Sequence, residues 1–301
     1  MADHQQSHSG ETAVSETLRS AGTGVRVATA AVLLPLVVGA VWWGPPWLVA
    51  FLVAAVTVVS LEEFFTLGAR QGLQGYRLWT AACAVGVIAS QLSAGGTRAY
   101  HLGRDLLLLN EPQVPLDFIL LAFVFGLAAA VVLGRRALVD ALGSLGMSAA
   151  GLLLIALPLS YIVRLRGLQD GPTWLLFTLA LIWVGDTAAY FTGRAIGRLP
   201  MAAQISPKKT WEGAAGNLLG SLVVAGVFSR WLGVGAVHLI AMAVLANIAG
   251  QLGDLAESAC KRGAGVKDSG SLLPGHGGML DRIDALIFAA PVVWAYVSFL
   301  H

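Results

Sequence analysis

Acidic, basic and glycine residues are concentrated in the segment SACKRGAGVKDSGSLLPGHGGMLDRID, residues 258–284, of a chain that is otherwise mostly apolar. Four polar residues just before and at its beginning fall at positions i, i+3, i+4 and i+7 of a helix and would share one face: Asp254, Glu257, Ser258 and Lys261. Asp281 and Asp284 open the last apolar run, so their carboxylates would face back toward Asp254. Carboxylates bind Mg²⁺, which also bridges to substrate phosphates, while lysine and arginine neutralise phosphate charge. The pattern favours a site for a divalent cation and a polyphosphate.

Two earlier segments carry further candidate residues. In WVGDTAAYFTGR, Asp186 lies inside an apolar helix, where a carboxylate costs roughly 2.5–3.5 kcal/mol near the bilayer centre. A cation, a metal ion or a water-filled cavity would compensate it, or it is a structural residue bonded to a neighbouring helix. In ISPKKTWEG, Lys208 and Lys209 precede another apolar run. Taken alone, such a lysine pair is more often an anchor on the cytoplasmic side of a membrane than a binding site.

These residues favour phosphoryl chemistry over two other readings. One is a secondary transporter, in which Asp186 would couple an ion, and the other is a solvated loop with a basic anchor. The sequence has neither the internal repeats nor the paired broken helices that mark many transporters. It also lacks a Walker loop, a zincin pair and a nucleophile elbow, so the phosphate and hydrolase motifs of soluble enzymes do not apply.

The composition indicates which elements position these residues. The chain has 301 residues, of which 56% are hydrophobic and only 12% are charged, against about 25% charged in a soluble domain. We therefore predict an all-α polytopic membrane protein, with apolar runs long enough to cross a bilayer. Nine candidate transmembrane helices occupy residues 27–44, 47–66, 78–95, 115–133, 142–163, 173–192, 214–231, 234–253 and 285–300.

Charge and cysteine content exclude other classes. The net charge of +2 and the lack of a basic stripe argue against nucleic-acid binding. Cys83 and Cys260 have neither the number nor the spacing of a disulfide framework or a zinc site.

The loop charges predict the orientation of the spans. With a cytoplasmic N-terminus, only five of the 19 basic residues fall on the outer side, namely Arg98, Arg104, Arg164, Arg166 and Arg230. We expect a disordered cytoplasmic tail (1–26), N-terminal transmembrane helices (27–172) and a C-terminal catalytic region (173–301). Both long polar loops of that region, 193–213 and 254–284, would lie on the cytoplasmic face.

The C-terminal segment resembles the signature of the phosphatidate cytidylyltransferase family, also called CDP-diacylglycerol synthases. The signature positions are met by Ser258, Lys261, Arg262, Lys267, Asp268, Gly270, Leu273, Pro274, His276, Gly277, Gly278, Met279, Asp281, Arg282, Ile283 and Asp284. Cys260 departs from it, standing where an aliphatic residue or Phe is usual. Residues 206–213 and 185–198 also resemble family segments, with Ala188 at a position where Gly is common.

The resemblance implies that CTP and phosphatidic acid react to CDP-diacylglycerol and pyrophosphate at the cytoplasmic face of the plasma (inner) membrane. It also implies Mg²⁺, with K⁺ as a second candidate ion, around Asp254 and Asp281. Glu257, Asp284 and Asp268 are alternative metal ligands, and Lys261 and Asp186 join the two aspartates as expected catalytic residues. The remaining candidates would bind phosphate groups: Ser206, Lys208, Lys209, Arg262, Lys267, His276 and Arg282. A related enzyme acting on another lipid phosphate stays open, as does a homodimer.

Overall fold

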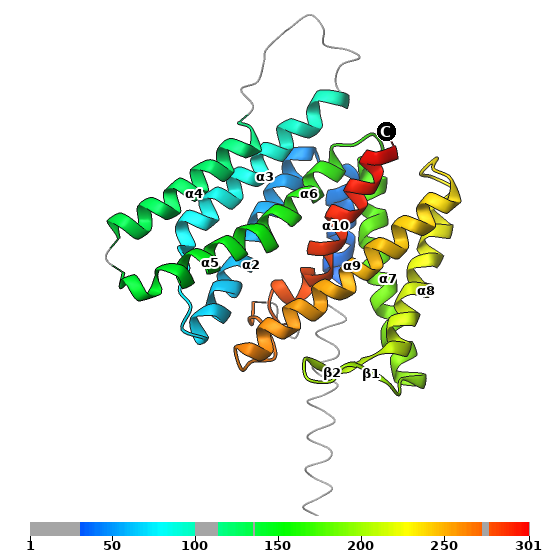
Figure 1. Ribbon diagram of the computed structural model, residues 1–301. Helices are drawn as coiled ribbons and strands as arrows, with labels where there is room; N and C mark the ends of the chain where they lie inside the picture. Colours follow the sequence, from blue (N-terminus) through cyan, green and yellow to red (C-terminus); the bar gives the residue numbers. More distant parts are fainter. Residues whose placement is uncertain (1–30, 100–113, 135, 273–276, 301) are drawn as a thin grey trace, which may run out of the picture.

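The computed structural model describes residues 31–99, 114–134, 136–272 and 277–300, so the predicted tail 1–26 and His276 lie outside the described residues. Nearly all of the described chain is helical, as Figure 1 shows. The helices before the C-terminal half are Ala31–Trp43, α2 (Pro46–Arg70), α3 (Arg77–Ala99), α4 (Leu116–Leu133), η1 (Leu138–Asp140), α5 (Ala141–Gly151), η2 (Leu152–Ala156, a π-helical turn) and α6 (Leu157–Arg166). The C-terminal half contains α7 (Gly171–Ile196), β1 (Pro200–Ala202), β2 (Ser206–Thr210), α8 (Trp211–Phe228), α9 (Ala236–Gly263) and α10 (Leu280–Leu300).

Seven helices in the described residues are long and apolar enough to cross a membrane. One of them is the continuous stretch Leu138–Arg166, in which the π-turn η2 joins α5 to α6. Two further apolar helices, Ala31–Trp43 and Arg77–Leu92, are shorter. The prediction of a polytopic, mainly helical membrane protein is therefore confirmed, whereas the count of nine spans is not.

A small β-hairpin interrupts the helices, which the prediction of an all-α chain did not include. Strand β1 pairs with β2 in antiparallel fashion, with Pro200 opposite Thr210 and Ala202 opposite Ser206. Pro207 disfavours helical geometry at the residue before it, which keeps this segment extended. Thr210 then caps α8, because its hydroxyl accepts a hydrogen bond from the Gly213 N–H at 3.1 Å. The hairpin thus leads Lys208 and Lys209 directly to the start of a membrane helix.

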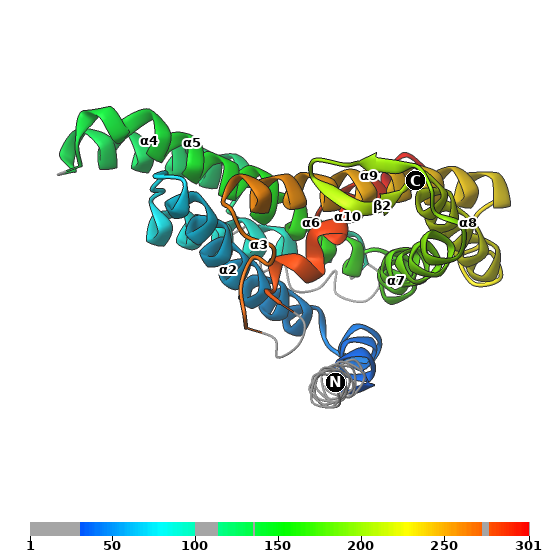
Figure 2. The same cartoon turned by 90° about the horizontal axis from the view of Figure 1, so that it is seen from below.

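The C-terminal helices pack as two close pairs, α7 with α8 and α9 with α10 (Figures 1 and 2). Gly253 permits the second pair, since a Cβ there would lie only 2.5 Å from Phe288 Cδ2 and 2.6 Å from the Asp284 carbonyl oxygen. In Figure 2, α2 to α5 lie on one side of α6, α9 and α10, and α7 and α8 lie on the other. Helices α9 and α10 therefore occupy the middle of the molecule, with the hairpin beside α9.

Candidate functional site

A cleft of about 460 Å³ opens between α7, the hairpin, α8 and α9. Four residues predicted from separate sequence segments line it together: Asp186, Lys208, Lys209 and Asp254. Arg194, Asn217 and Gln251 line it as well and were not among the predicted site residues. The cleft carries both signs of charge, with carboxylates on the transmembrane helices and lysines on the hairpin.

The closest charged contact in the cleft joins Lys209 to Asp254. The Lys209 ammonium lies 2.5 Å from Asp254 Oδ2, and the two side chains are 27% and 35% exposed. Because the hairpin extends over α9, the lysine pair faces helix α9 and does not simply point away into solvent. Lys208 and Lys209 are therefore placed where they could bind a ligand in the cleft, although their sequence alone favoured a membrane anchor.

Asp186 is bonded to the neighbouring helix and faces the cleft. Its Oδ1 accepts a hydrogen bond from the Asn217 amide on α8 at 3.1 Å. Asn217 accepts in turn from Asn247 at 2.5 Å, and the Asn247 carbonyl oxygen accepts from Gln251 at 2.6 Å. A smaller cavity of about 30 Å³, lined by these four residues and Asp254, continues from the cleft into the bundle. Asp186 thus has the partner on a neighbouring helix that the structural alternative requires, and it also borders a small cavity. Its compensation by a cation, a metal ion or water stays a prediction.

A second cluster centres on the buried Lys261. Its ammonium lies 2.6 Å from Asp281 Oδ1 and forms an ion pair with Glu257, one helical turn earlier on α9. Glu257 and Lys261 are each only 8% exposed. Such burial of a charge requires pairing, since an isolated charge in an apolar interior is very costly. The cluster therefore fixes the last turns of α9 against the beginning of α10.

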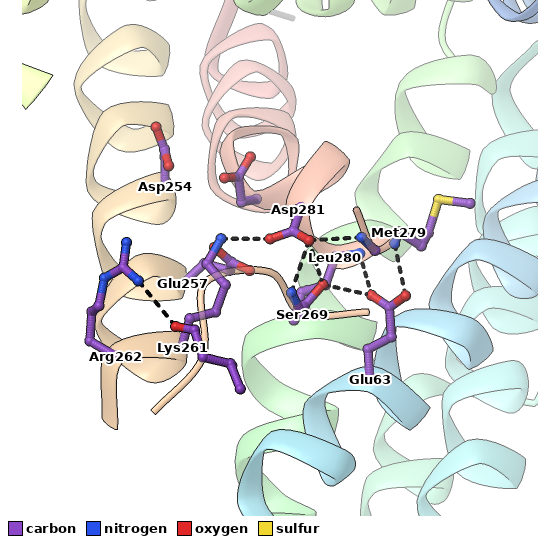
Figure 3. A network of polar contacts seen from close by, with 12 residues as sticks. Glu63, Asp254, Glu257, Lys261, Arg262, Ser269, Met279, Leu280 and Asp281 are labelled. Carbon is purple, nitrogen blue, oxygen red and sulfur yellow. Dashed lines mark hydrogen bonds and ion pairs between the residues drawn. The ribbon is translucent and has the colours of Figure 1, made fainter. Parts of the chain in front are cut away.

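Both carboxylate oxygens of Asp281 already have partners (Figure 3). While Oδ1 faces Lys261, Oδ2 lies 2.9 Å from the Ser269 N–H, 3.0 Å from the Ser269 hydroxyl and 2.8 Å from the Gly278 N–H. A metal ion at Asp281 would have to replace at least one of these contacts. The assignment of Asp281 as a metal ligand stays a prediction.

Asp284 lies between the acids of the cleft and the Lys261 cluster. Its carboxyl group interacts electrostatically with Asp254 and with Glu257, and Asp186 interacts in the same way with Asp254. The expectation that the acids opening α10 face back toward Asp254 is therefore met by Asp284, whereas Asp281 meets Lys261.

The other predicted residues lie at the edge of the site. Arg262 donates to the Ile205 and Val266 carbonyl oxygens, each at 3.1 Å, and so ties the end of α9 to the hairpin. Ser206 lies in the hairpin opposite Ala202. Among the described residues of the signature, four are exposed, namely Arg262, Lys267, Asp268 and Arg282. His276 lies outside the described residues, so its assignment stays a prediction.

The sequence analysis missed one central residue, Glu63 on α2. Its Oε1 accepts from the Met279 N–H at 2.9 Å, and its Oε2 lies 2.8 Å from the Leu280 N–H and 2.9 Å from the Ser269 hydroxyl. The sequence did contain a signal for Glu63, because a carboxylate inside an apolar helix requires a partner. Its neighbour Glu62 instead forms an exposed ion pair with Arg77 at 2.9 Å.

The carboxylates suit Mg²⁺ as partial ligands. In the described ranges, no group of three or more His, Cys, Asp and Glu side chains is placed to enclose a metal ion. Magnesium, however, commonly keeps several waters and takes one or two carboxylates together with substrate phosphates. Asp254 lines the cleft, pairs with Lys209 and interacts electrostatically with two further acids, Asp186 and Asp284. These hard carboxyl oxygen donors fit a divalent cation, to which they would supply one or two ligands.

Comparison with known proteins covers both halves of the chain. A family model described as the cytidylyltransferase family matches residues 24–300. Phosphatidate cytidylyltransferase of Bacillus subtilis is 36% identical over 182 residues, which are 60% of this chain and 66% of that protein. The proteins of the same name from Brucella suis and Haemophilus influenzae are 44% identical over 156 residues and 46% identical over 123 residues.

The last two alignments cover 50% and 39% of this chain, and 57% and 43% of the relatives. The chain thus aligns with less than two thirds of the length of each of these relatives. The family match itself extends well beyond the C-terminal segments that carry the sequence resemblance, into the helices of the N-terminal half. The chain belongs to the cytidylyltransferase family.

Proposed function

We propose that this membrane protein transfers the cytidylyl group of CTP to phosphatidic acid, which gives CDP-diacylglycerol and pyrophosphate. The observation that carries the proposal is the cleft in which Lys208 and Lys209 face Asp186 and Asp254. The names of the relatives support the choice of substrates. A phosphate oxygen of the lipid forms a new bond to the α-phosphorus of CTP, and the bond between the α-phosphorus and the bridging oxygen of pyrophosphate breaks. This displacement requires no covalent bond to the protein.

The basic residues of the cleft would bind the triphosphate. Lys208, Lys209 and Arg194 supply three cationic groups along its wall. Charge-assisted hydrogen bonds of this kind are about twice as strong as neutral ones. Holding both substrates in line lowers the barrier mainly through orientation and charge neutralisation. Lys209 would exchange part of its contact with Asp254 for phosphate oxygens.

Asp254 is the residue best placed to hold Mg²⁺, with Asp284 or Asp186 as its partner. When bound, the ion supplies a positive charge that screens the phosphate oxygens and orients them for displacement. Release of Lys209 from Asp254 by the triphosphate would leave this carboxylate available. Binding of K⁺ stays a prediction alongside Mg²⁺.

Lys261 acts in this proposal through position. Its ion pairs to Glu257 and Asp281 hold the acids that open α10 beside α9. The exposed residues Lys267, Arg282 and Arg262 surround this end of the bundle and would meet the incoming lipid phosphate or the leaving pyrophosphate. Direct phosphate contact by Lys261 stays a prediction, as does metal binding by Asp268.

We further propose that the cleft faces the cytoplasm from the plasma (inner) membrane. The lysines of the hairpin and the basic end of α9 lie at the same end of the molecule, joined by the Arg262 contact to Ile205, and positive charge favours the cytoplasmic side. Labelling of a cysteine placed at Lys208 by a membrane-impermeant reagent, in intact and in opened cells, tests this orientation. A homodimer also stays a prediction, which the mass of the detergent-solubilised protein would test.

Release of pyrophosphate by purified protein in detergent tests the reaction. We expect release only when CTP, phosphatidic acid and Mg²⁺ are all present, and much less with ATP, GTP or UTP. Release with a polyprenyl phosphate or an archaeol-type phosphate in place of phosphatidic acid would assign the enzyme to a different lipid. Release that needs no lipid would contradict the proposal.

A further inference from the structure

We propose that Glu63 is a positioning residue of the active site, contributed by the N-terminal half of the chain. This inference rests on the proposed function. The carboxylate of Glu63 comes from α2 and reaches the segment that joins α9 to α10, where it contacts Ser269, Met279 and Leu280 (Figure 3). Its partners are two backbone N–H groups and one hydroxyl, so it fixes the path of the main chain.

Glu63 acts as a helix cap supplied by another helix. Helix α10 begins at Leu280, and the N–H groups of Met279 and Leu280 have no acceptor within the first turn of that helix. Glu63 accepts both, at 2.9 and 2.8 Å. Its negative charge also lies at the positive end of the helix dipole. The beginning of α10 is therefore fixed to α2 as well as to α9.

Two glycines of the signature provide the space that Glu63 occupies. A Cβ atom at Gly270 would lie 2.5 Å from Glu63 Oε1, and one at Gly278 would lie 2.5 Å from Oε2. Both distances are far below van der Waals contact. The carboxylate and the two glycines form a matched set, in which a larger residue at either position would displace Glu63.

Ser269 connects Glu63 to the charged cluster. Its hydroxyl lies 2.9 Å from Glu63 Oε2 and 3.0 Å from Asp281 Oδ2, and Asp281 binds Lys261. Glu63 is not among the residues that line the cleft with Lys209 and Asp254. We therefore expect Glu63 to affect the turnover step, through the position of Asp281 and Asp284, more than the binding of CTP.

The test compares Glu63→Gln with Glu62→Gln in the full-length protein. Both substitutions remove one carboxylate from the same helix, but the carboxylate of Glu62 is exposed and pairs with Arg77. In Glu63→Gln, an NH2 group replaces one of the two acceptor oxygens. This group cannot accept a hydrogen bond from the backbone N–H of Met279 or Leu280. We expect kcat for transfer from CTP to fall about 10- to 100-fold, the cost of a small misplacement of reacting groups. The KM for CTP should change less than about threefold, because its binding residues are untouched.

A readout independent of activity separates this inference from the proposed reaction. Lys267 is exposed in the segment after α9, so trypsin can cleave there. Loss of the Glu63 contacts should raise the cleavage rate at Lys267 in Glu63→Gln but not in Glu62→Gln, at temperatures where both bundles remain folded. If the wild type proves inactive with CTP and phosphatidic acid, the proposed reaction fails, while this cleavage difference still tests the contact.

A second variant covers the case in which Glu63→Gln does not fold. Ser269→Ala removes one of the three donors and leaves the backbone contacts in place. Its effect on kcat should be smaller, and in the double variant with Glu63→Gln the two effects should be less than additive, as expected for residues in contact. The inference is overturned if Glu63→Gln matches Glu62→Gln in kcat and cleavage rate. It is equally overturned if Ser269→Ala leaves kcat and the cleavage rate at the wild-type values.

Discussion

The ammonium group of Lys209 lies 2.5 Å from the carboxylate of Asp254, and this contact joins the β-hairpin to the transmembrane helix α9. It brings together two segments that the sequence separates by more than forty residues. In the absence of substrate, each charge neutralises the other. A triphosphate that binds the lysine would free the carboxylate for a cation, so binding of CTP would prepare the site for the metal ion.

Replacement of Lys209 by alanine should weaken the binding of CTP. The change removes one of the cations that line the cleft and leaves Asp254 without its counter-charge, so the cleft becomes more negative toward a polyanion. We expect the KM for CTP to rise about tenfold, which corresponds to the loss of about 1.4 kcal/mol. Steady-state kinetics with varied CTP would measure this, with Arg230→Ala as the control for loss of an exposed basic residue. Unchanged kinetics would return Lys209 to the role of a membrane anchor.

Replacement of Asp281 by asparagine should lower both activity and stability. The amide loses the ion pair to Lys261 and cannot accept all the hydrogen bonds from Ser269 and Gly278. Loss of such buried contacts costs about 1–3 kcal/mol. Thermal unfolding in detergent and in the presence of a chelator separates the two roles. A normal unfolding temperature with lost activity would favour Asp281 as a metal ligand only. Activity and an unfolding temperature both near the wild-type values would exclude both roles.

Replacement of Asp186 by asparagine should preserve the fold and reduce activity. The new side chain can still accept the hydrogen bond from Asn217, but one negative charge beside Asp254 is lost. Changes in the surroundings of a metal ligand typically cost about 10- to 100-fold in metal affinity or activity. We expect the Mg²⁺ concentration for half-maximal activity to rise, while Asp117→Asn, at an exposed position of α4, leaves it unchanged. If Asp186→Asn and Asp117→Asn behave alike, Asp186 is purely structural.

Replacement of Gly253 by alanine should separate α9 from α10. The added methyl group would meet a backbone oxygen, at Asp284, which cannot rotate away. Overpacking of this kind costs about 1–3 kcal/mol. The matched control is Gly226→Ala in α8, where nothing lies within 4 Å of the added atom, so the substitution should be neutral or stabilising by about 0.5–1 kcal/mol. Equal unfolding temperatures for the two variants would contradict the close packing of α9 and α10.

Local spacing predicted the features that depend on one helix. The four-residue interval between Glu257 and Lys261 places them on the same face of α9, where they form an ion pair. The apolar runs predicted the membrane helices for the same reason, since length and hydropathy are properties of single segments.

Contacts between distant segments could not be predicted in this way. Glu63 and Ser269 are 206 residues apart, and nothing in the local pattern of either residue identifies the other. Asn217, Asn247 and Gln251 look like ordinary polar positions of transmembrane helices until the packing of α8 against α9 brings them beside Asp186. The hairpin was missed because its strands are only three and five residues long.

The proposed transfer is tested most directly with CTP labelled at its α-phosphorus. Purified wild-type protein is incubated with phosphatidic acid, with and without Mg²⁺, and the lipids are extracted into chloroform. We predict that label enters the lipid fraction only when phosphatidic acid and Mg²⁺ are both present, and that one pyrophosphate is released for each label transferred. Folded protein that transfers no label to phosphatidic acid would contradict the proposed function.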